Sequence, residues 1–547
     1  MGRPSQTSSE DCIDLQVPGE RQNSGPSQSS SHGTASSPGH SIESEASDTD
    51  LHMEAMIPTL VDRVAKMEVV NPEVLRVTPV FRATEHFAIA LRVESAGDFF
   101  HKSHRSQKIS TFWSHSWHAG HWKKILAIIT LYNGTAAVLL SLLTGAWMMV
   151  LFSLGILPGI DRGWWTDSFQ WSCWSTFTGF VVASLVIVFW RPRTGVFLDR
   201  ICISQKDARL KTEAILSLAG LLKHSDRMLI LWDPTWTERL WCLFELAAFL
   251  KSKTTQQQHL TVRPIFMGPL SIATFLTFAA VAMPIATVPV DDERTIVQLL
   301  SAIVFCAIVV AVPTVSTVRS YFRDLDTMKL QLLSISVDST RSSCCDLNHV
   351  SPSGERMLCD RKIVKECVKI WFGSELTFED TVRTEVLDIL NRDLTQKVFS
   401  TPWAWGVTSP IILAFMDVSA SWTQADFPWK LWEHPAVALL LEGLMTWFLF
   451  VPANKDLLIL LVRLGRRRPR NPCLELLKNL LVLAAAAIPP LALVVAYGFT
   501  RFTDQVVFDT ENAMLRAVGF ACCTLLIALC NFLLGLGLKA LLRRPGW

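Results

Sequence analysis

Long apolar runs alternate with polar stretches along this chain of 547 residues. A helix needs roughly 18 to 25 apolar residues to cross a hydrocarbon core about 30 Å thick. Eight runs approach or reach that length, and the pattern therefore predicts eight transmembrane helices. The runs cover residues 134–157, 172–190, 266–287, 296–318, 404–420, 436–451, 476–497 and 514–538. The fifth and sixth are short and flanked by prolines.

The placement of lysine and arginine predicts how these helices are oriented. Basic residues are enriched on the cytosolic side of a membrane protein. Two groups of them flank the last runs: Arg463, Arg466, Arg467, Arg468 and Arg470 before the seventh, and Lys539, Arg543 and Arg544 after the eighth. With eight crossings, both termini and the segments 191–264 and 319–402 are then cytosolic. Nothing in the sequence indicates which membrane holds this multi-pass protein.

The amino-acid composition also indicates a membrane protein. Half of the residues are hydrophobic and only 18% are charged, which is too apolar for an ordinary soluble enzyme. The lipid bilayer is therefore the predicted partner. A net charge of +2 with scattered basic residues gives no case for nucleic acid. Residues 1–50 are of low complexity and predict a disordered tail without a secretory signal, and 51–108 form a cytosolic N-terminal extension.

The segment between the second and third runs has the pattern of a water-soluble α/β domain. Strands are predicted at 196–203, 227–232 and 261–266, and helices at 212–224 and 237–251. Strands that alternate with helices over short connections form a parallel sheet covered on both faces. In such sheets the ligand crevice lies beyond the carboxyl ends of the strands.

The order of motifs in this segment resembles the Toll/interleukin-1 receptor (TIR) domain. A strand ends in Phe197-Leu-Asp199, and a later helix carries Arg239-Leu-Trp-Cys-Leu-Phe-Glu-Leu246, followed by Arg263-Pro-Ile-Phe266. The resemblance implies an earlier strand, which Ile109-Ser-Thr-Phe-Trp-Ser-His-Ser-Trp117 supplies, with a short helix at 122–129. The loop after Asp199 lacks the family's glycine-bearing turn, and the usual last strand and helix are missing.

The expected fold is therefore an α-helical multi-pass membrane protein with a cytosolic α/β TIR-like domain, which has a flavodoxin-like parallel sheet. The first transmembrane hairpin, 131–190, splits this domain into 109–130 and 191–265. A second hairpin, 266–318, precedes a cytosolic helical lobe, 319–402. Four transmembrane helices over 403–538 and a cytosolic tail, 539–547, complete the predicted organisation.

The resemblance also implies a chemistry, because some TIR domains cleave NAD at the bond between nicotinamide and ribose. That reaction passes through an oxocarbenium-like state, which a carboxylate stabilises. By motif position Glu245 would be the catalytic residue and NAD the substrate, with no other cofactor indicated. The residues implied in NAD binding are Ser114, His115 and Asp199 on one rim of the sheet, and Trp236 and Trp241 as stacking partners of the nicotinamide.

Each of these residues could also have a purely structural role. Glu245 could pair with Arg239 or Lys251, Trp241 could be core packing, and His115 could be a hydrogen-bonded structural residue. The sequence therefore leaves open a TIR-like scaffold that signals by homotypic assembly without chemistry.

A transporter with a soluble appendage is a further alternative, because ionisable groups inside membrane spans often mark a substrate path. Asp417 and Glu442 are the clear candidates.

The cysteines predict neither a disulfide framework nor a metal centre. The chain has 13 of them and no Cys-x-x-Cys pair. The densest group joins Cys344, Cys345, His349, Cys359 and Cys367. Structural zinc is usually held by two close ligand pairs, so reduced or acylated thiols are the favoured interpretation.

Overall fold

A computed structural model divides the chain into two compact units. It describes residues 54–92, 97–117, 120–161, 170–253, 259–287, 293–350, 354, 356–423, 434–469, 471–506 and 513–542. The sheet unit combines Met1–His121, Arg193–Pro264 and Met328–Asp393, and the helical unit combines the remaining segments. The predicted tail at 1–50 and residues 543–547 of the predicted tail at 539–547 lie outside the described residues.

The sheet unit contains a six-stranded mixed sheet in the order β2-β1-β6-β3-β7-β8. Its strands are β1 (Arg76–Pro79), β2 (His104–Arg105), β3 (Ile109–His115), β6 (Gly195–Phe197), β7 (Ser225–Trp232) and β8 (His259–Pro264). Strands β6, β3, β7 and β8 run parallel to one another, whereas β1 is antiparallel to both β2 and β6. Counted in chain order, the parallel strands lie 2-1-3-4, as in doubly wound sheets of the flavodoxin type.

The register of β3 joins segments on either side of the first long helical insertion. Thr111 pairs with Val196 and Phe112 with Phe197, while β7 lies along the other edge of β3 from Ile109 to His115. The rings of Phe112 and Phe197 are stacked with centroids 4.9 Å apart, and both side chains are buried. The predicted parallel sheet is therefore present, with β3 at its centre.

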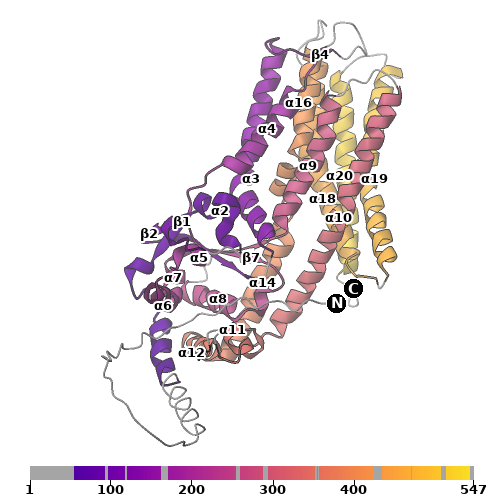
Figure 1. The fold of residues 1–547 in the computed structure, drawn as a ribbon. Coiled ribbons are helices and arrows are strands. Elements are labelled where there is room, and N and C mark those ends of the chain that lie inside the picture. Colours follow the sequence, from indigo (N-terminus) through magenta and orange to yellow (C-terminus); the bar gives the residue numbers. More distant parts are fainter. Residues whose placement is uncertain are drawn as a thin grey trace, which may run out of the picture. The chain divides into compact units, whose positions relative to one another are not determined.

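Short helices connect and cover these strands. They are α2 (Val80–Ala88), α5 (Asp199–Cys202), α6 (Ala208–Leu216), α7 (Leu218–Lys223) and α8 (Leu240–Ser252), with 3₁₀ turns η2 (Pro72–Val74), η3 (Ile89–Leu91), η4 (Phe100–Lys102) and η5 (Trp236–Glu238). Helix α8 packs against α7 and β3 and buries nine of its thirteen side chains (Figure 1). The helix predicted at 212–224 is broken at Ser217, whose hydroxyl and amide both donate to the Glu213 carbonyl (2.7 and 3.0 Å).

The N-terminal extension predicted at 51–108 contributes to the sheet rather than standing apart from it. It supplies β1 and β2, and its backbone lies against α7, where an added Cβ on Gly220 would come 2.7 Å from the carbonyl carbon of Glu68. The Val70 amide donates to Ser217 Oγ (2.9 Å), and Asn71 Nδ2 donates to Glu213 (2.7 Å). The sequence pattern missed β1 and β2 because they are short, with four and two residues.

The third segment of the sheet unit, Met328–Asp393, is helical. It comprises η7 (Val337–Ser339), α11 (Ser343–Asp346), α12 (Asp360–Phe372), α13 (Glu375–Thr381), the π-helix η8 (Val382–Val386) and α14 (Leu387–Arg392). Helix α12 ends at Gly373, whose φ of 84° is readily reached only without a Cβ. It packs against α8, so this segment is attached to the sheet.

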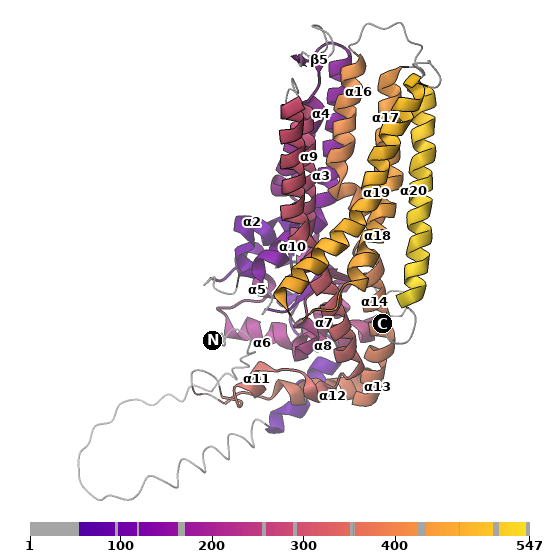
Figure 2. The same ribbon diagram turned by 90° about the vertical axis from the view of Figure 1, so that its right-hand side faces the viewer.

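The helical unit carries the apolar runs. Its helices are α3 (His121–Ser153), α4 (Trp174–Phe189), α9 (Met267–Thr287), α10 (Glu293–Leu333), α15 (Thr401–Val407), α16 (Ser409–Thr423), α17 (Pro435–Met445), α18 (Val451–Leu464), α19 (Pro472–Val506) and α20 (Ala513–Leu542). The π-helices η9 (Asp393–Lys397) and η11 (Thr446–Phe450) and the strand pair β4 (Ile160–Asp161) and β5 (Gln170–Trp171) complete it. Helix α20 packs against α17, α18 and α19 (Figure 2).

Five of these helices are long and apolar enough to cross a membrane. They are His121–Ser153, Met267–Pro284, Pro435–Leu464, Pro472–Ala496 and Leu515–Leu538. The third of these is the continuous stretch of α17, η11 and α18. Helices α15 and α16 pass the same test only as a pair, which is bent by 53°. Helix α4 is shorter, with 16 residues. This count, made on the described residues, is smaller than the eight predicted from the sequence, but it gives the chain the character of an integral membrane protein.

Two helix boundaries in the helical unit differ from those predicted from the sequence. The amphipathic helix expected at 122–129 is the first part of α3, since no proline interrupts the chain before Ser153. The fifth run is broken at Thr408, because Pro410 has no amide hydrogen to donate to the Gly406 carbonyl and its ring clashes with that carbonyl in a continuous helix.

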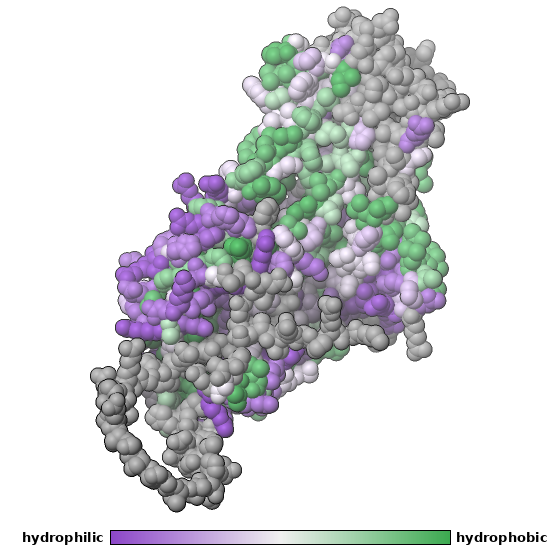
Figure 3. Space-filling view, in the orientation of Figure 1, coloured by the Kyte–Doolittle hydropathy of each residue, from purple (hydrophilic) through white to green (hydrophobic). Residues whose placement is uncertain are grey.

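The exposed side chains of the helical unit are largely apolar. Exposed leucine, valine and phenylalanine side chains are frequent on α3, α4, α19 and α20. In Figure 3 the visible surface of these long helices is largely hydrophobic, whereas hydrophilic residues dominate around β1 and α2. An apolar exterior is what lipid-facing helices require.

We expect Gly220→Ala to destabilise the sheet unit by about 1–3 kcal/mol, because the new methyl group meets backbone atoms that cannot rotate away. Thermal unfolding of the purified protein in detergent measures this effect. Gly120→Ala is the matched control, since nothing lies within 4 Å of its added Cβ. Equal unfolding midpoints for the two variants would contradict the close packing of the extension on α7.

Candidate functional site

The carboxyl ends of β3 and β7 meet at the point where the strand order reverses. Strand β6 lies on one side of β3 and β7 on the other. In doubly wound sheets, loops at such a point diverge and leave room for a ligand. Ser114 and His115 end β3 and pair with Ile230 and Leu231 of β7. This edge of the sheet is therefore the expected position of a functional site.

A hydrogen-bonded chain connects this edge to Glu245 on α8. Trp236 Nε1 donates to Ser114 Oγ (3.0 Å), and Ser114 Oγ donates to Glu245 Oε2 (2.5 Å). Ser114 and Trp236 are completely buried, whereas Glu245 is partly exposed. The two buried groups thus fix the position of one oxygen of the Glu245 carboxyl.

The Glu245 carboxyl has a strongly perturbed acidity. Burial and, to a smaller extent, the nearby charge of Asp199 together raise its pKa to about 8, although the hydrogen bond from Ser114 opposes the rise. A carboxyl that changes its charge near neutral pH suits a role in proton transfer or charge stabilisation.

Asp199 lies at the start of α5 and is held by two donors. Its Oδ2 accepts from Trp117 Nε1 (3.1 Å), and its Oδ1 accepts from the Arg200 amide (2.7 Å). The His115 ring packs against the Trp117 ring, with centroids 4.6 Å apart. Asp199 and His115 are therefore on the same edge as Glu245, as the sequence interpretation requires.

The structure does not support stacking by the two predicted tryptophans. Trp236 is completely buried, so its ring has no open face for a nicotinamide. Trp241 turns toward the third segment, where its Nε1 donates to Asp360 (3.0 Å) and its ring meets Phe244 edge-on. Trp236 is a positioning residue for Ser114, and Trp241 fixes α8 to α12.

The simplest alternative for Glu245 was a surface ion pair. Lys251 donates instead to the Trp371 carbonyl (2.5 Å). Ser114 is the one hydrogen-bond partner of Glu245 within the described part of the chain.

Trp117 was overlooked as a site residue although it belongs to the first-strand motif. Its position two residues beyond His115 was the available signal, because a side chain just past a parallel strand lies at the ligand-binding edge. Ser116 and Thr235, which are hydrogen-bonded to each other (2.8 Å), join the β3 and β7 loops and carried no recognisable signal.

The ionisable groups of the helical unit are occupied by internal contacts. Asp417 accepts from the Ser175 and Thr176 amides and from the Ser172 hydroxyl, each at 2.8 Å. It therefore caps the first turn of α4, whose amides have no partners within the helix. Glu442 is buried with Arg516 Nε 3.8 Å from its Oε1. Both acids have structural partners.

Among the described residues, one group of side chains could hold a metal ion. It combines Cys344, Cys345, His349 and Cys359 and is separate from the residues around Glu245.

No protein-family model matches this chain, and neither a curated protein nor a solved structure is significantly similar to it.

The raised pKa of Glu245 links folding to pH. Between about 4.5, its ordinary value, and about 8, the folded chain holds a proton that the unfolded chain releases, so stability falls as pH rises. The penalty is absent below this window and complete above it.

Glu245→Gln removes this penalty. We expect the variant to unfold at a higher temperature than the parent at about pH 9 and at nearly the same temperature at about pH 4.5. Thermal unfolding at the two pH values measures the difference. A difference that does not change with pH would contradict the assigned ionisation.

Proposed function

We propose that this protein is a multi-pass membrane protein whose sheet unit is a TIR-like domain that hydrolyses NAD through Glu245. The observation that carries the proposal is the hydrogen-bonded chain from Trp236 through Ser114 to Glu245, located beside the point where the parallel strand order reverses. The motif resemblance, the 2-1-3-4 order of the parallel strands and the perturbed carboxyl all support the same assignment.

In the proposed reaction, the bond between nicotinamide nitrogen and ribose C1′ breaks, and the bonding electrons leave with the nicotinamide. Ionised Glu245 stabilises the oxocarbenium-like ribose. Water then forms the new bond to C1′ and releases a proton, giving ADP-ribose and nicotinamide. The cationic nicotinamide ring favours the ionised form of Glu245 when NAD binds.

We also infer that the chain crosses the membrane eight times, with the sheet unit on the cytosolic side. The sheet unit contains three chain segments, separated by 122–192 and 265–327. A polar sheet edge cannot lie in hydrocarbon, so all three segments belong on one side. Each separating segment must then cross an even number of times. This requires α4 to cross with α3, and α10 with α9.

The two alternative functions, a membrane transporter and a TIR-like scaffold without chemistry, explain fewer features of the structure. Transport would need an accessible ionisable group in the helical unit, whereas Asp417 and Glu442 hold neighbouring elements together. A scaffold without chemistry gives no reason for a carboxyl that Ser114 holds in place and whose pKa is about 8. Absence of NAD consumption would favour the scaffold.

The direct test is NAD consumption by membranes that contain the full chain. We expect Glu245→Gln to lower kcat/KM at least about 100-fold, because the transition state loses its carboxylate. Glu213→Gln is the control, since that acid is paired with Arg209 on α6 and lies outside the site. Equal rates for the Glu245 variant and the parent, or no consumption by either, would reject the proposal.

The dependence of kcat/KM on pH tests the role of ionisation. We expect the parent activity to rise through an apparent pKa of about 8, because the carboxylate is the active form. Ser114→Ala removes a hydrogen bond that lowers this pKa, so its profile should move to higher pH. A parent profile that is flat from about pH 6 to about pH 9 is incompatible with the proposed role.

A further inference from the structure

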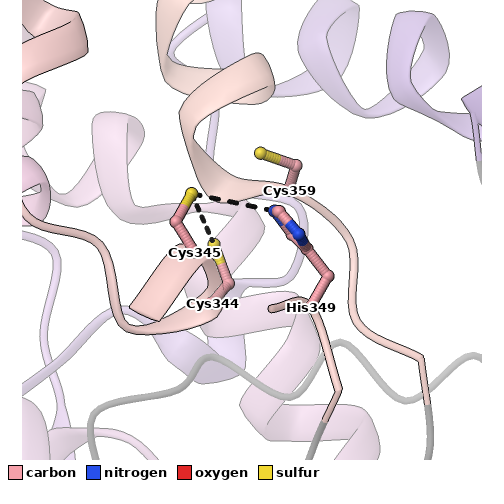
Figure 4. Close-up of side chains that lie close together, drawn as sticks. All are labelled: Cys344, Cys345, His349 and Cys359. Atoms are coloured by element: carbon pink, nitrogen blue, oxygen red, sulfur yellow. Dashed lines mark hydrogen bonds between the residues drawn. The ribbon is translucent and has the colours of Figure 1, made fainter. Parts of the chain in front are cut away.

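Three cysteines and one histidine of the third segment come together beside α11. The ligand atoms of Cys344, Cys345, His349 and Cys359 all lie within 4.8 Å of one another. The Cys344 and Cys345 sulfurs are 3.9 Å apart, and Cys345 Sγ is 3.7 Å from His349 Nε2. Figure 4 shows that these side chains converge from α11, the following loop and the start of α12.

The spacing fits a tetrahedral ion better than a disulfide. An ion at ~2.3 Å from sulfur and ~2.1 Å from nitrogen separates its ligand atoms by roughly 3.6–3.8 Å. The two measured separations are close to these values. A disulfide would bring two sulfurs to ~2.05 Å. Three thiol groups and one imidazole are a common ligand set for structural zinc.

The backbone arranges the ligands in a way that sequence spacing does not reveal. Asn348 and His349 have positive φ angles of 51° and 60°, and the His349 amide donates to the Cys344 carbonyl (2.7 Å). These left-handed residues turn the imidazole back toward the α11 cysteines. The Met357 amide then donates to the His349 carbonyl (2.9 Å), which returns the chain to Cys359.

Among the described residues, few apolar side chains are buried around the cluster. The buried cluster at this position consists of Cys344 and Met357, with Cys345 and Leu347 partly buried against it. Small loops with so little core generally need a metal or a disulfide to remain folded. The four donors are therefore explained better by a bound ion than by packing alone.

Contacts on both sides of the cluster attach it to α8. The Leu240 amide donates to the Arg341 carbonyl (3.0 Å), and the Arg341 amide donates to the Glu238 carbonyl (2.7 Å). On the other side, Asp360 follows Cys359 directly and accepts the hydrogen bond from Trp241. An ion in the cluster would thus connect the two attachments to the N-terminus of α8.

We propose that Cys344, Cys345, His349 and Cys359 bind one structural zinc ion, which fixes the third segment to the start of α8. This replaces the sequence interpretation of reduced or acylated thiols. Cys367 is buried on α12 and is not a member of the group. The site is independent of the proposed NAD chemistry.

The test is the metal content of the full chain, purified in detergent without chelator and measured by inductively coupled plasma mass spectrometry. We expect about one zinc ion per chain. Cys345→Ser and His349→Ala should each lower that content roughly tenfold or more under the same dialysis. His349→Cys keeps four donors and should retain zinc. Cys473→Ser, which changes an exposed thiol outside the cluster, is the matched control.

A second measurement does not depend on the variants folding. A maleimide should modify the cluster cysteines of the parent only after zinc is removed by a chelator, because the bound ion occupies their sulfurs. Parent protein without zinc, zinc that persists in both Cys345→Ser and His349→Ala, or equal cysteine labelling before and after chelation would overturn the proposal.

Discussion

The pairing of β3 with β6 is the constraint on which the rest of the structure depends. The two strands are neighbours and parallel, yet the helices α3 and α4 separate them in the chain. In an ordinary doubly wound fold, one covering helix makes such a connection. Here the connection is long and apolar, so the sheet can close only if the chain returns to the side that it left. The α9–α10 insertion before the third segment is subject to the same condition.

The second constraint is the cost of placing a carboxyl beside a buried strand end. Glu245 avoids most of that cost by keeping a proton near neutral pH, and Ser114 and Trp236 fix its orientation. Burial alone would favour an apolar residue at this position of α8, whose neighbours are nearly all apolar. The retained acid, close to the charge of Asp199, is therefore the feature of this helix that packing does not explain.

Sequence periodicity predicted the parts of the fold that local chemistry determines. Strands β7 and β8 and helix α8 have apolar patterns of their own. The TIR resemblance pointed to β3 with Ser114, and the separate Phe197-Leu-Asp199 motif pointed to Asp199. Interactions between distant residues were not predictable: Trp241 meets Asp360 from 119 positions away, and the register of the short strand β1 depends on β6. The sequence showed the group of cysteines around His349 but not that four of its side chains converge, because left-handed backbone at Asn348 and His349, rather than regular spacing, brings them together.

The claim that all three segments of the sheet unit lie on one side of the membrane is tested most directly by labelling single introduced cysteines with a membrane-impermeant maleimide. Gln107→Cys, Gln205→Cys and Glu366→Cys place an exposed thiol on each of the three segments of the sheet unit. The labelling of each variant is measured in sealed right-side-out vesicles and in sealed inside-out vesicles, and the labelling of the parent chain is subtracted. The account predicts that all three sites react in the same orientation. Reaction of any one of them from the opposite side would contradict it.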